Sequence, residues 1–261
     1  MAAITRIVIR VVVMVLLLAT RDRAEEPQGV VVSDSVARLH IRDPMPLLEA
    51  LFHLSKTFGW RIGFEEARLT YLGDLVDMTS PKYTPKNKGD RAYLPRGGPL
   101  DIQFPVNSVT QQPGQPAAVI RELLAEYERR GYPGKYSFTS EQGEDAFIYV
   151  FPEAVANAAG VYEKTTPISS IKITILVQEN EQVIRVLDDA CRSLQSQTGK
   201  RVLLVGRGMA SNLEFQPAGR QLAAHDEATY SFLNRAVAAV GSRFWQLLYD
   251  PGQKYYLLGY R

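Results

Sequence analysis

The chain has 261 residues, of which 46% are hydrophobic and 22% are charged, and its formal net charge is +2 at pH 7. This length accommodates one large domain or two small ones, and the composition excludes a disordered or low-complexity chain. The charge falls to near neutrality once residues 1–24 are set aside, because they hold four Arg and one Asp. We therefore expect no binding to nucleic acid, which depends on phosphate neutralisation by a basic surface.

Residues 1–24 have the features of a signal peptide. Arg6 and Arg10 precede an apolar run at 11–19, which is the order of basic and hydrophobic regions in exported proteins. A membrane span needs about 20 apolar residues, and Arg10 and Arg21 bracket far fewer. We expect a periplasmic or secreted protein whose mature chain does not span a membrane. An uncleaved anchor is the alternative, because no cleavage site stands out.

From residue 171 to the C-terminus, the pattern indicates strand, helix, strand, strand, helix, strand and strand. The expected strands are 171–177, 201–205, 213–215, 244–249 and 254–258. The first helix ends at Gly199, and the second begins near Asp226 and ends at Gly241. The apolar residues of the first helix recur at helical spacing; they are Ile184, Leu187, Cys191 and Leu194.

A looser copy of this order precedes it. The expected strands are 36–41, 60–64, 100–105, 136–138 and 147–151, and the helices end at Gly59 and Gly131. The copies diverge at 71–99, which has no counterpart in the second half. We predict an α+β fold of two tandem βαββαβ-like units, each with two helices packed on a small mixed sheet. The units are expected at 30–152 and 168–261, joined by a linker at 153–167.

Core and turn positions of the second copy carry a likeness to a known domain family. They are residues 186–194 (VLDDACRSL), 198–202 (TGKRV) and 227–233 (EATYSFL). These segments resemble the first helix, the strand after it and the second helix of the secretin and TonB short N-terminal domain. The first copy resembles it less closely. The resemblance implies protein–protein interaction in the periplasm and supplies no catalytic residues.

Motifs for a cofactor or a metal are weak. Gly206 and Gly208 follow a strand as in a dinucleotide fingerprint, but Ser211 replaces the third glycine. The expected next element is a strand, whereas a phosphate site needs a helix N-terminus there. The histidines lack a second ligand at a metal-binding spacing; they are His40, His53 and His225. We expect no cofactor and no metal.

Nucleophiles and acid–base groups are also weakly indicated. Cys191 is the only cysteine, and its place on an apolar helix face predicts a small buried residue. The paired acids fit a solvated helix face or a turn; they are Glu65 with Glu66, Glu122 with Glu126, and Asp188 with Asp189. We find no catalytic motif and do not expect an enzyme.

The best functional candidate is the basic, aromatic-bearing insertion near 71–99. Its candidate partner-binding residues are Lys82, Tyr83, Lys86, Lys88, Arg91, Tyr93 and Arg96. Within residues 82–96, only Asp90 opposes the five positive charges. Such a loop on a rigid scaffold suits an anionic partner, such as lipid headgroups, a glycan or an acidic protein face. The alternative is a solvated insertion without a partner.

The C-terminal strand is a second candidate. We expect residues 254–260, with Tyr255 and Tyr256, to present an exposed strand edge. A partner strand extends such an edge by main-chain hydrogen bonds. Packing of these tyrosines in the core is the alternative.

Together these features predict an exported, non-catalytic module for protein–protein interaction or scaffolding. Its expected partner is an envelope protein, and self-association is a further option. The alternative is an envelope enzyme or a small-ligand sensor with its site between the two units. A convergent polar cluster at that junction, formed by His225 or the paired acids, would favour the alternative.

Overall fold

The computed structural model describes residues 28–80, 91–140, 147–205 and 217–261. Within these ranges, no helix combines the length and apolar character needed to cross a membrane. The predicted signal peptide and the strand expected at 213–215 lie outside the described residues. The helix expected to begin near Asp226 begins at Thr229, because Ala224–Ala228 form a strand that pairs antiparallel with Lys172–Ile175.

The helices and strands alternate in two similar series. The first unit contains β1 Gly29–Ser33, β2 Val36–Ile41, α2 Pro46–Phe58, β3 Arg61–Glu65, β4 Leu75–Asp77, β5 Tyr93–Pro95, β6 Leu100–Pro105, α3 Pro116–Arg129, β7 Lys135–Ser140 and β8 Phe147–Ala156. After β9 Tyr162–Lys164, the second unit contains β10 Lys172–Ile175, α4 Val183–Thr198, β11 Val202–Leu204, β12 Ala224–Ala228, α5 Thr229–Ala239, β13 Phe244–Asp250 and β14 Tyr255–Tyr260. Short 3-10 turns occur at η1 Leu72–Asp74, η3 Ile168–Ser170 and η5 Arg220–Leu222.

Strand pairing confirms the predicted α+β fold with a repeated order of elements. In the first unit β2 pairs antiparallel with β6, β3 pairs parallel with β8, and β7 pairs antiparallel with β8. In the second unit β10 pairs antiparallel with β12, β11 pairs parallel with β14, and β13 pairs antiparallel with β14. In each unit, the helices therefore lie between a pair of antiparallel strands and a mixed sheet of three strands. The first unit has β1 as an additional strand beside its antiparallel pair.

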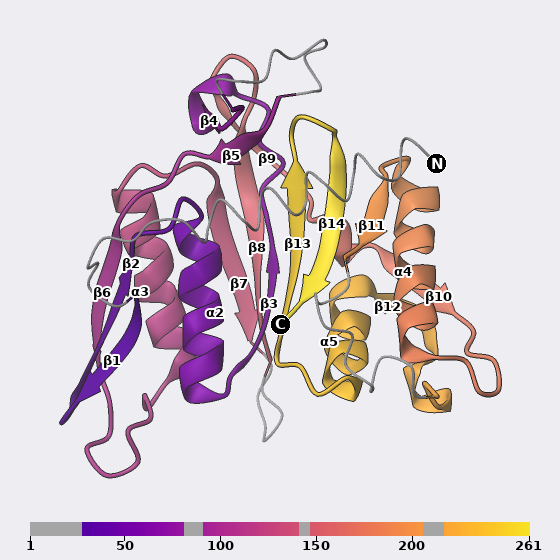
Figure 1. The fold of residues 1–261 in the computed structure, drawn as a ribbon, viewed down its shortest axis with the longest axis horizontal. Coiled ribbons are helices and arrows are strands. Elements are labelled where there is room, and N and C mark those ends of the chain that lie inside the picture. Colours follow the sequence, from indigo (N-terminus) through magenta and orange to yellow (C-terminus); the bar gives the residue numbers. More distant parts are fainter. Residues whose placement is uncertain (1–27, 81–90, 141–146, 206–216) are drawn as a thin grey trace.

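The two three-strand sheets join into one. β13 pairs in parallel with β3, and the strands follow the order β11-β14-β13-β3-β8-β7. Along β8, Phe147 and Tyr149 enter the core of the second unit, whereas Ile148 and Val150 enter the core of the first. Because alternate residues of a strand point to opposite faces, the helices of the two units cover opposite faces of this sheet. Figure 1 shows α2 and α3 on one side of these strands and α4 and α5 on the other.

The segment expected as a linker, 153–167, includes part of one strand and all of another. β8 continues to Ala156, and its end pairs antiparallel with β9, with Ala154 opposite Lys164. The connection then enters the second unit through η3. The two units are therefore joined by a hairpin and a short turn rather than by a free linker.

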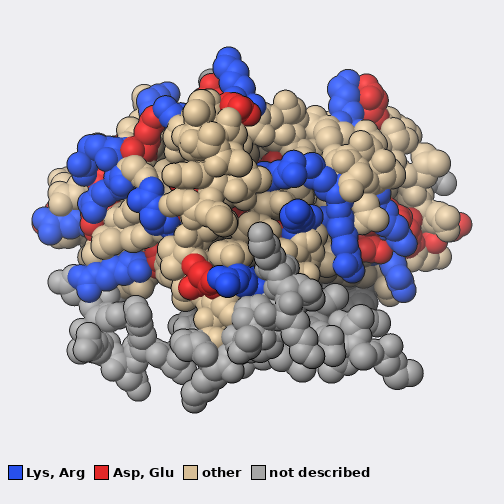
Figure 2. Space-filling view, turned by 90° about the horizontal axis from the view of Figure 1, so that it is seen from above, with Lys and Arg blue, Asp and Glu red and all other residues tan. Residues whose placement is uncertain are grey.

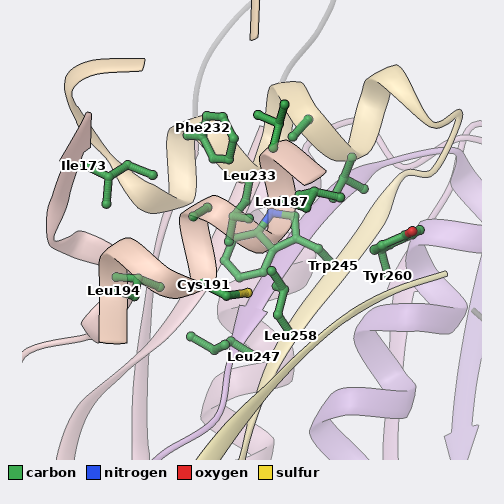
Figure 3. Close-up of a cluster of buried hydrophobic side chains, with 14 of the residues drawn as sticks. Ile173, Leu187, Cys191, Leu194, Phe232, Leu233, Trp245, Leu247, Leu258 and Tyr260 are labelled. Carbon is green, nitrogen blue, oxygen red and sulfur yellow. The ribbon is translucent and has the colours of Figure 1, made fainter. Parts of the chain in front are cut away.

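Helix ends and helix faces follow from the sequence. α2 has Pro46 in its first turn, where proline costs no hydrogen bond. α2 and α4 stop at Gly59 (φ 72°) and Gly199 (φ 64°), in the left-handed conformation that glycine adopts without strain. Cys191 is fully buried on α4, as predicted, beside Leu187 and Leu194 (Figure 3). Burial raises the pKa of its thiol to about 12, which disfavours the reactive thiolate.

Gly63 of β3 lies under the indole of Trp245 of β13, at the join between the units. A Cβ atom at Gly63 would lie 2.3–2.6 Å from three atoms of the indole. Trp245 is buried, and its Nε1–H donates a hydrogen bond of 2.7 Å to Asn234 Oδ1. The buried, hydrogen-bonded ring therefore has little freedom to move away from an added Cβ atom.

We predict that Gly63→Ala lowers the free energy of unfolding by about 1–3 kcal/mol, the usual cost of overfilling a packed core. Gly259→Ala in β14 is the matched control, because its Cβ would meet only the Gln246 side chain, at 3.4 Å or more. Guanidinium denaturation of both variants measures the difference. Equal stability of the two variants would contradict this account of the join.

Candidate functional site

The insertion between β3 and β6 is partly ordered by its own hairpin. η1 leads into β4, and β4 pairs antiparallel with β5, with Leu75 opposite Pro95. Lys82, Tyr83, Lys86 and Lys88 lie outside the described residues. Of the predicted partner-binding residues in this insertion, the structure describes Arg91, Tyr93 and Arg96.

These three residues contribute to holding the insertion in place. Arg91 Nη1 lies 2.8 Å from Asp77 Oδ2, across the β4–β5 hairpin. Arg96 Nη2 donates to the carbonyl oxygen of Gly131 at 2.9 Å, which ties the insertion to the end of α3. Tyr93 is half-buried in β5. The described positive charges of the insertion therefore have structural partners within the chain.

Exposed apolar side chains gather beside this hairpin. Leu72 is 70% exposed and Val161 is 59% exposed, and the other members are Val76, Met78 and Tyr162. The two segments touch, because a Cβ atom at Gly160 would lie 3.3 Å from the Tyr71 ring. Figure 1 places β4, β5 and β9 at the same end of the molecule. We call Leu72, Val76, Met78, Val161 and Tyr162 the insertion face.

Among the residues that the structure describes at this end, charge is distributed rather than concentrated. Figure 2 looks onto it and shows Lys and Arg spread over the surface, several of them beside Asp or Glu, with uncharged surface between. The apolar members of the insertion face were missed from the sequence. The signal present was Val161 and Tyr162, which follow the turn-forming residues Asn157 and Gly160 and predict an exposed hairpin.

The C-terminal strand is not an exposed edge, so that prediction is wrong. β14 pairs with β11 on one side and with β13 on the other. Tyr255 and Tyr256 are buried, with exposures of 8% and 2%. The alternative of core packing therefore holds, because β14 is the central strand of the three-strand sheet of its own unit.

The paired acids Glu65 and Glu66 are buried at the junction of the two units, so the prediction of a solvated turn is wrong for this pair. Glu65 Oε1 accepts from the N–H of Ile168 at 2.8 Å. Its Oε2 accepts from the N–H and Oγ–H of Ser169, at 3.0 and 2.6 Å, and from the Tyr149 hydroxyl at 3.1 Å. Burial raises the pKa of Glu65 more than these hydrogen bonds lower it.

Glu66 reaches a different element of the second unit. Its Oε2 accepts from the N–H of Tyr249 in β13 at 2.8 Å, and its own N–H donates to Leu247 O at 2.9 Å. Burial raises its pKa to about 8. Polar groups of both units therefore converge here, and the two carboxyl groups accept protein hydrogen bonds that tie the units together.

The histidines occupy separate places. His40 of β2 pairs with Asp101 of β6, His53 is half-buried on α2, and His225 is exposed on β12. Within the ranges that the structure covers, no three His, Cys, Asp or Glu side chains are grouped as a metal site. His225 does not take part in the hydrogen bonds of Glu65 and Glu66 described above.

We predict that Glu66 makes stability fall as pH rises. Its folded-state pKa of about 8 lies above its ordinary value of 4.5, so the folded chain keeps a proton that the unfolded chain releases. Its stabilising contribution is complete below the ordinary pKa and is lost as pH rises to about 8, at about 1.4 kcal/mol per pH unit. Glu66→Gln should reduce this slope in urea titrations at a series of pH values, whereas Glu65, whose pKa burial also raises, keeps its own contribution. Glu122→Gln, on the exposed face of α3, should keep it; equal slopes in both variants would contradict the assignment.

Comparison with known proteins adds no relative to this description. No protein-family model matches the chain, and neither does any curated protein or solved structure.

Proposed function

We propose that the protein is an exported, non-catalytic protein–protein interaction module that binds an envelope protein through the insertion face. The observation that carries this proposal is the exposure of Leu72 and Val161, at 70% and 59%, on two segments that touch each other. Apolar side chains grouped on a surface favour protein contact, because burying them removes apolar area from water. Export rests on the signal-peptide pattern of residues 1–24.

The insertion face is supported by a rigid base. Tyr71 packs against Gly160, and Arg96 anchors the hairpin to the end of α3. A preordered surface loses little conformational entropy on binding, which favours affinity. A partner with an apolar centre and a polar rim therefore fits the chemistry of the described residues at this end, since interfaces commonly combine an apolar core with a polar rim.

A site between the two units is the second candidate, as an envelope enzyme or a small-ligand sensor. The observation that favours it is the convergence of Glu65, Glu66, Tyr149 and Ser169 at the junction. Against it, the hydrogen bonds of Glu65 are made to protein groups, as in a structural carboxylate. A thermal-shift screen of small ligands, with Glu66→Gln as the comparison, tests this candidate.

For the interaction module, we predict that Leu72→Asp combined with Val161→Asp lowers capture of the envelope partner by about tenfold. A change of that size corresponds to the loss of about 1.4 kcal/mol of binding free energy. The measurement is in-cell cross-linking followed by mass spectrometry of the captured proteins. The melting temperature should stay unchanged, because both side chains are already exposed.

The matched control is Val109→Asp, since Val109 is 88% exposed in the connection between β6 and α3, away from the insertion face. It should leave capture intact. If the double variant captured the partner as well as the unmodified chain does, the insertion face would not be the binding surface. If only the control lost capture, the contact would lie at Val109 instead.

A further inference from the structure

The two units join where an edge strand of one three-strand sheet pairs with an edge strand of the other. Strands equivalent to these two also lie at the two ends of the shared sheet. β7 takes in the first unit the place that β13 takes in the second, because each pairs antiparallel with the last strand of its unit. β11 of the second unit corresponds to β3 of the first, because each pairs in parallel with the last strand of its own unit. Over the described part of the chain, neither β7 nor β11 has a strand on its outer side.

Within the shared sheet, the strands of one unit are related to those of the other by a rotation of 180° combined with a translation of three strands. The rotation axis lies in the plane of the sheet, perpendicular to the strands, and the translation runs along that axis. β13 runs parallel to β3, although their counterparts within one unit, β7 and β3, run in opposite directions. The helices of the units also cover opposite faces, while the order of strands is preserved. Such an operation does not close on itself, so its repetition extends the sheet.

We propose that the chain binds a second copy of itself head to tail, with β7 of one molecule beside β11 of the next. The pairing is parallel, as between β13 and β3. This contact goes beyond the proposed function and uses strands that do not belong to the insertion face. It is therefore independent of any envelope partner.

The internal junction also supplies the register. Gly59 and Gly199 end corresponding helices, so Ile62 and Val202, which follow these glycines at the same spacing, are counterparts. Ile62 lies opposite Ile148 on β8 and Val202 lies opposite Tyr256 on β14, so Val150 and Leu258, at the next inward position of each strand, also correspond. Phe138 faces Val150 and Leu247 faces Leu258, which makes Phe138 the counterpart of Leu247. In the junction, Trp245, Gln246 and Leu247 lie opposite Gly63, Phe64 and Glu65. Transferred to two molecules, this register places Tyr136, Ser137 and Phe138 opposite Leu203, Leu204 and Val205.

The backbone of β11 offers the hydrogen bonds that this pairing needs. Val205 N–H donates to Leu258 O, and Tyr256 N–H donates to Arg201 O, both at 2.8 Å. Because peptide groups alternate in direction along a strand, the N–H groups of Val202 and Leu204 point to the outer side. In the internal junction the counterpart of Val202, Ile62, donates its N–H to Arg243 O at 2.9 Å.

The side chains at the two edges suit the contact. Tyr136 and Phe138 on β7 are half-buried, and so are Leu203 and Val205 on β11. In the proposed register each aromatic ring lies beside an aliphatic side chain, a cross-strand arrangement that stabilises sheets. Lys135, the charged residue at the start of β7, is already paired with Glu128 at 2.8 Å.

The resulting assembly is open rather than closed at a fixed number of copies. Each added molecule contributes six strands to the sheet, an advance of roughly 29 Å at about 4.8 Å per strand. The average size should therefore grow with protein concentration. A closed ring or a two-fold dimer would instead reach a plateau.

The test is disulfide trapping between two single variants of the purified chain. Ser137→Cys and Leu204→Cys lie opposite each other in the proposed register, and Cα atoms on neighbouring strands are within disulfide reach. The native Cys191 is buried and does not compete. We expect a mixture of the two variants to form a cross-linked dimer through the introduced thiols, whereas either variant alone forms several-fold less.

The matched control mixes Ser137→Cys with Leu176→Cys, because Leu176 is 72% exposed and collides with other molecules more freely than Leu204. Cross-linking no greater than in this control would overturn the proposal. Equal cross-linking of Ser137→Cys with itself would also overturn it, since that outcome requires a symmetric β7-to-β7 contact.

Sedimentation velocity gives a second readout that needs no disulfide. The unmodified chain should shift to larger species as its concentration rises, and Leu203→Lys should remain monomeric, because a charge at a strand edge opposes pairing. Circular dichroism confirms that this variant is folded. A monomer at every concentration of the unmodified chain would contradict the assembly.

Discussion

The pairing of β3 with β13 is the contact on which the rest of the structure depends. It is possible at this closeness because Gly63 has no side chain and Trp245 packs into the space, held by Asn234. Through this pairing each unit supplies the other with part of its core: Phe147 and Tyr149 of β8 belong to the second core, and Phe244 of β13 belongs to the first. The repeats are therefore parts of one packed body, and neither has a complete core without the other.

Buried carboxyl groups secure the same join at one end of β3. Placing Glu65 in the interior is unfavourable unless its oxygens are satisfied, and three groups from η3 together with Tyr149 satisfy them. These hydrogen bonds fix where the connection between the units lies, because a shift of η3 along the sheet would leave the carboxyl group without partners. Apolar contacts alone are less directional, so the polar cluster gives the join its particular geometry.

The helices, their glycine ends and the repeated order of elements could be predicted from the sequence, because spacing along the chain determines them. Gly59 and Gly199 stop their helices where the pattern placed the ends. The neighbours of each strand could not be predicted this way, since they depend on residues far away in the sequence. For that reason Glu65 and Glu66 were expected in solvent, and 254–260 was expected at an edge. The insertion face was missed because β9 lies in a segment that looked like a linker.

The distance in sequence between β3 and β13 has a consequence for folding. β13 is synthesised well after β3, because the rest of the first unit and most of the second unit lie between them in the chain. Until β13 arrives, the edge of β3 and the side chains of Phe147 and Tyr149 have no cover from the second unit. Contacts between remote segments form slowly, and unpaired edges invite incorrect pairing in the meantime. The period before the C-terminal hairpin docks is therefore when this chain is most vulnerable to aggregation, and a protecting chaperone would act on the first half.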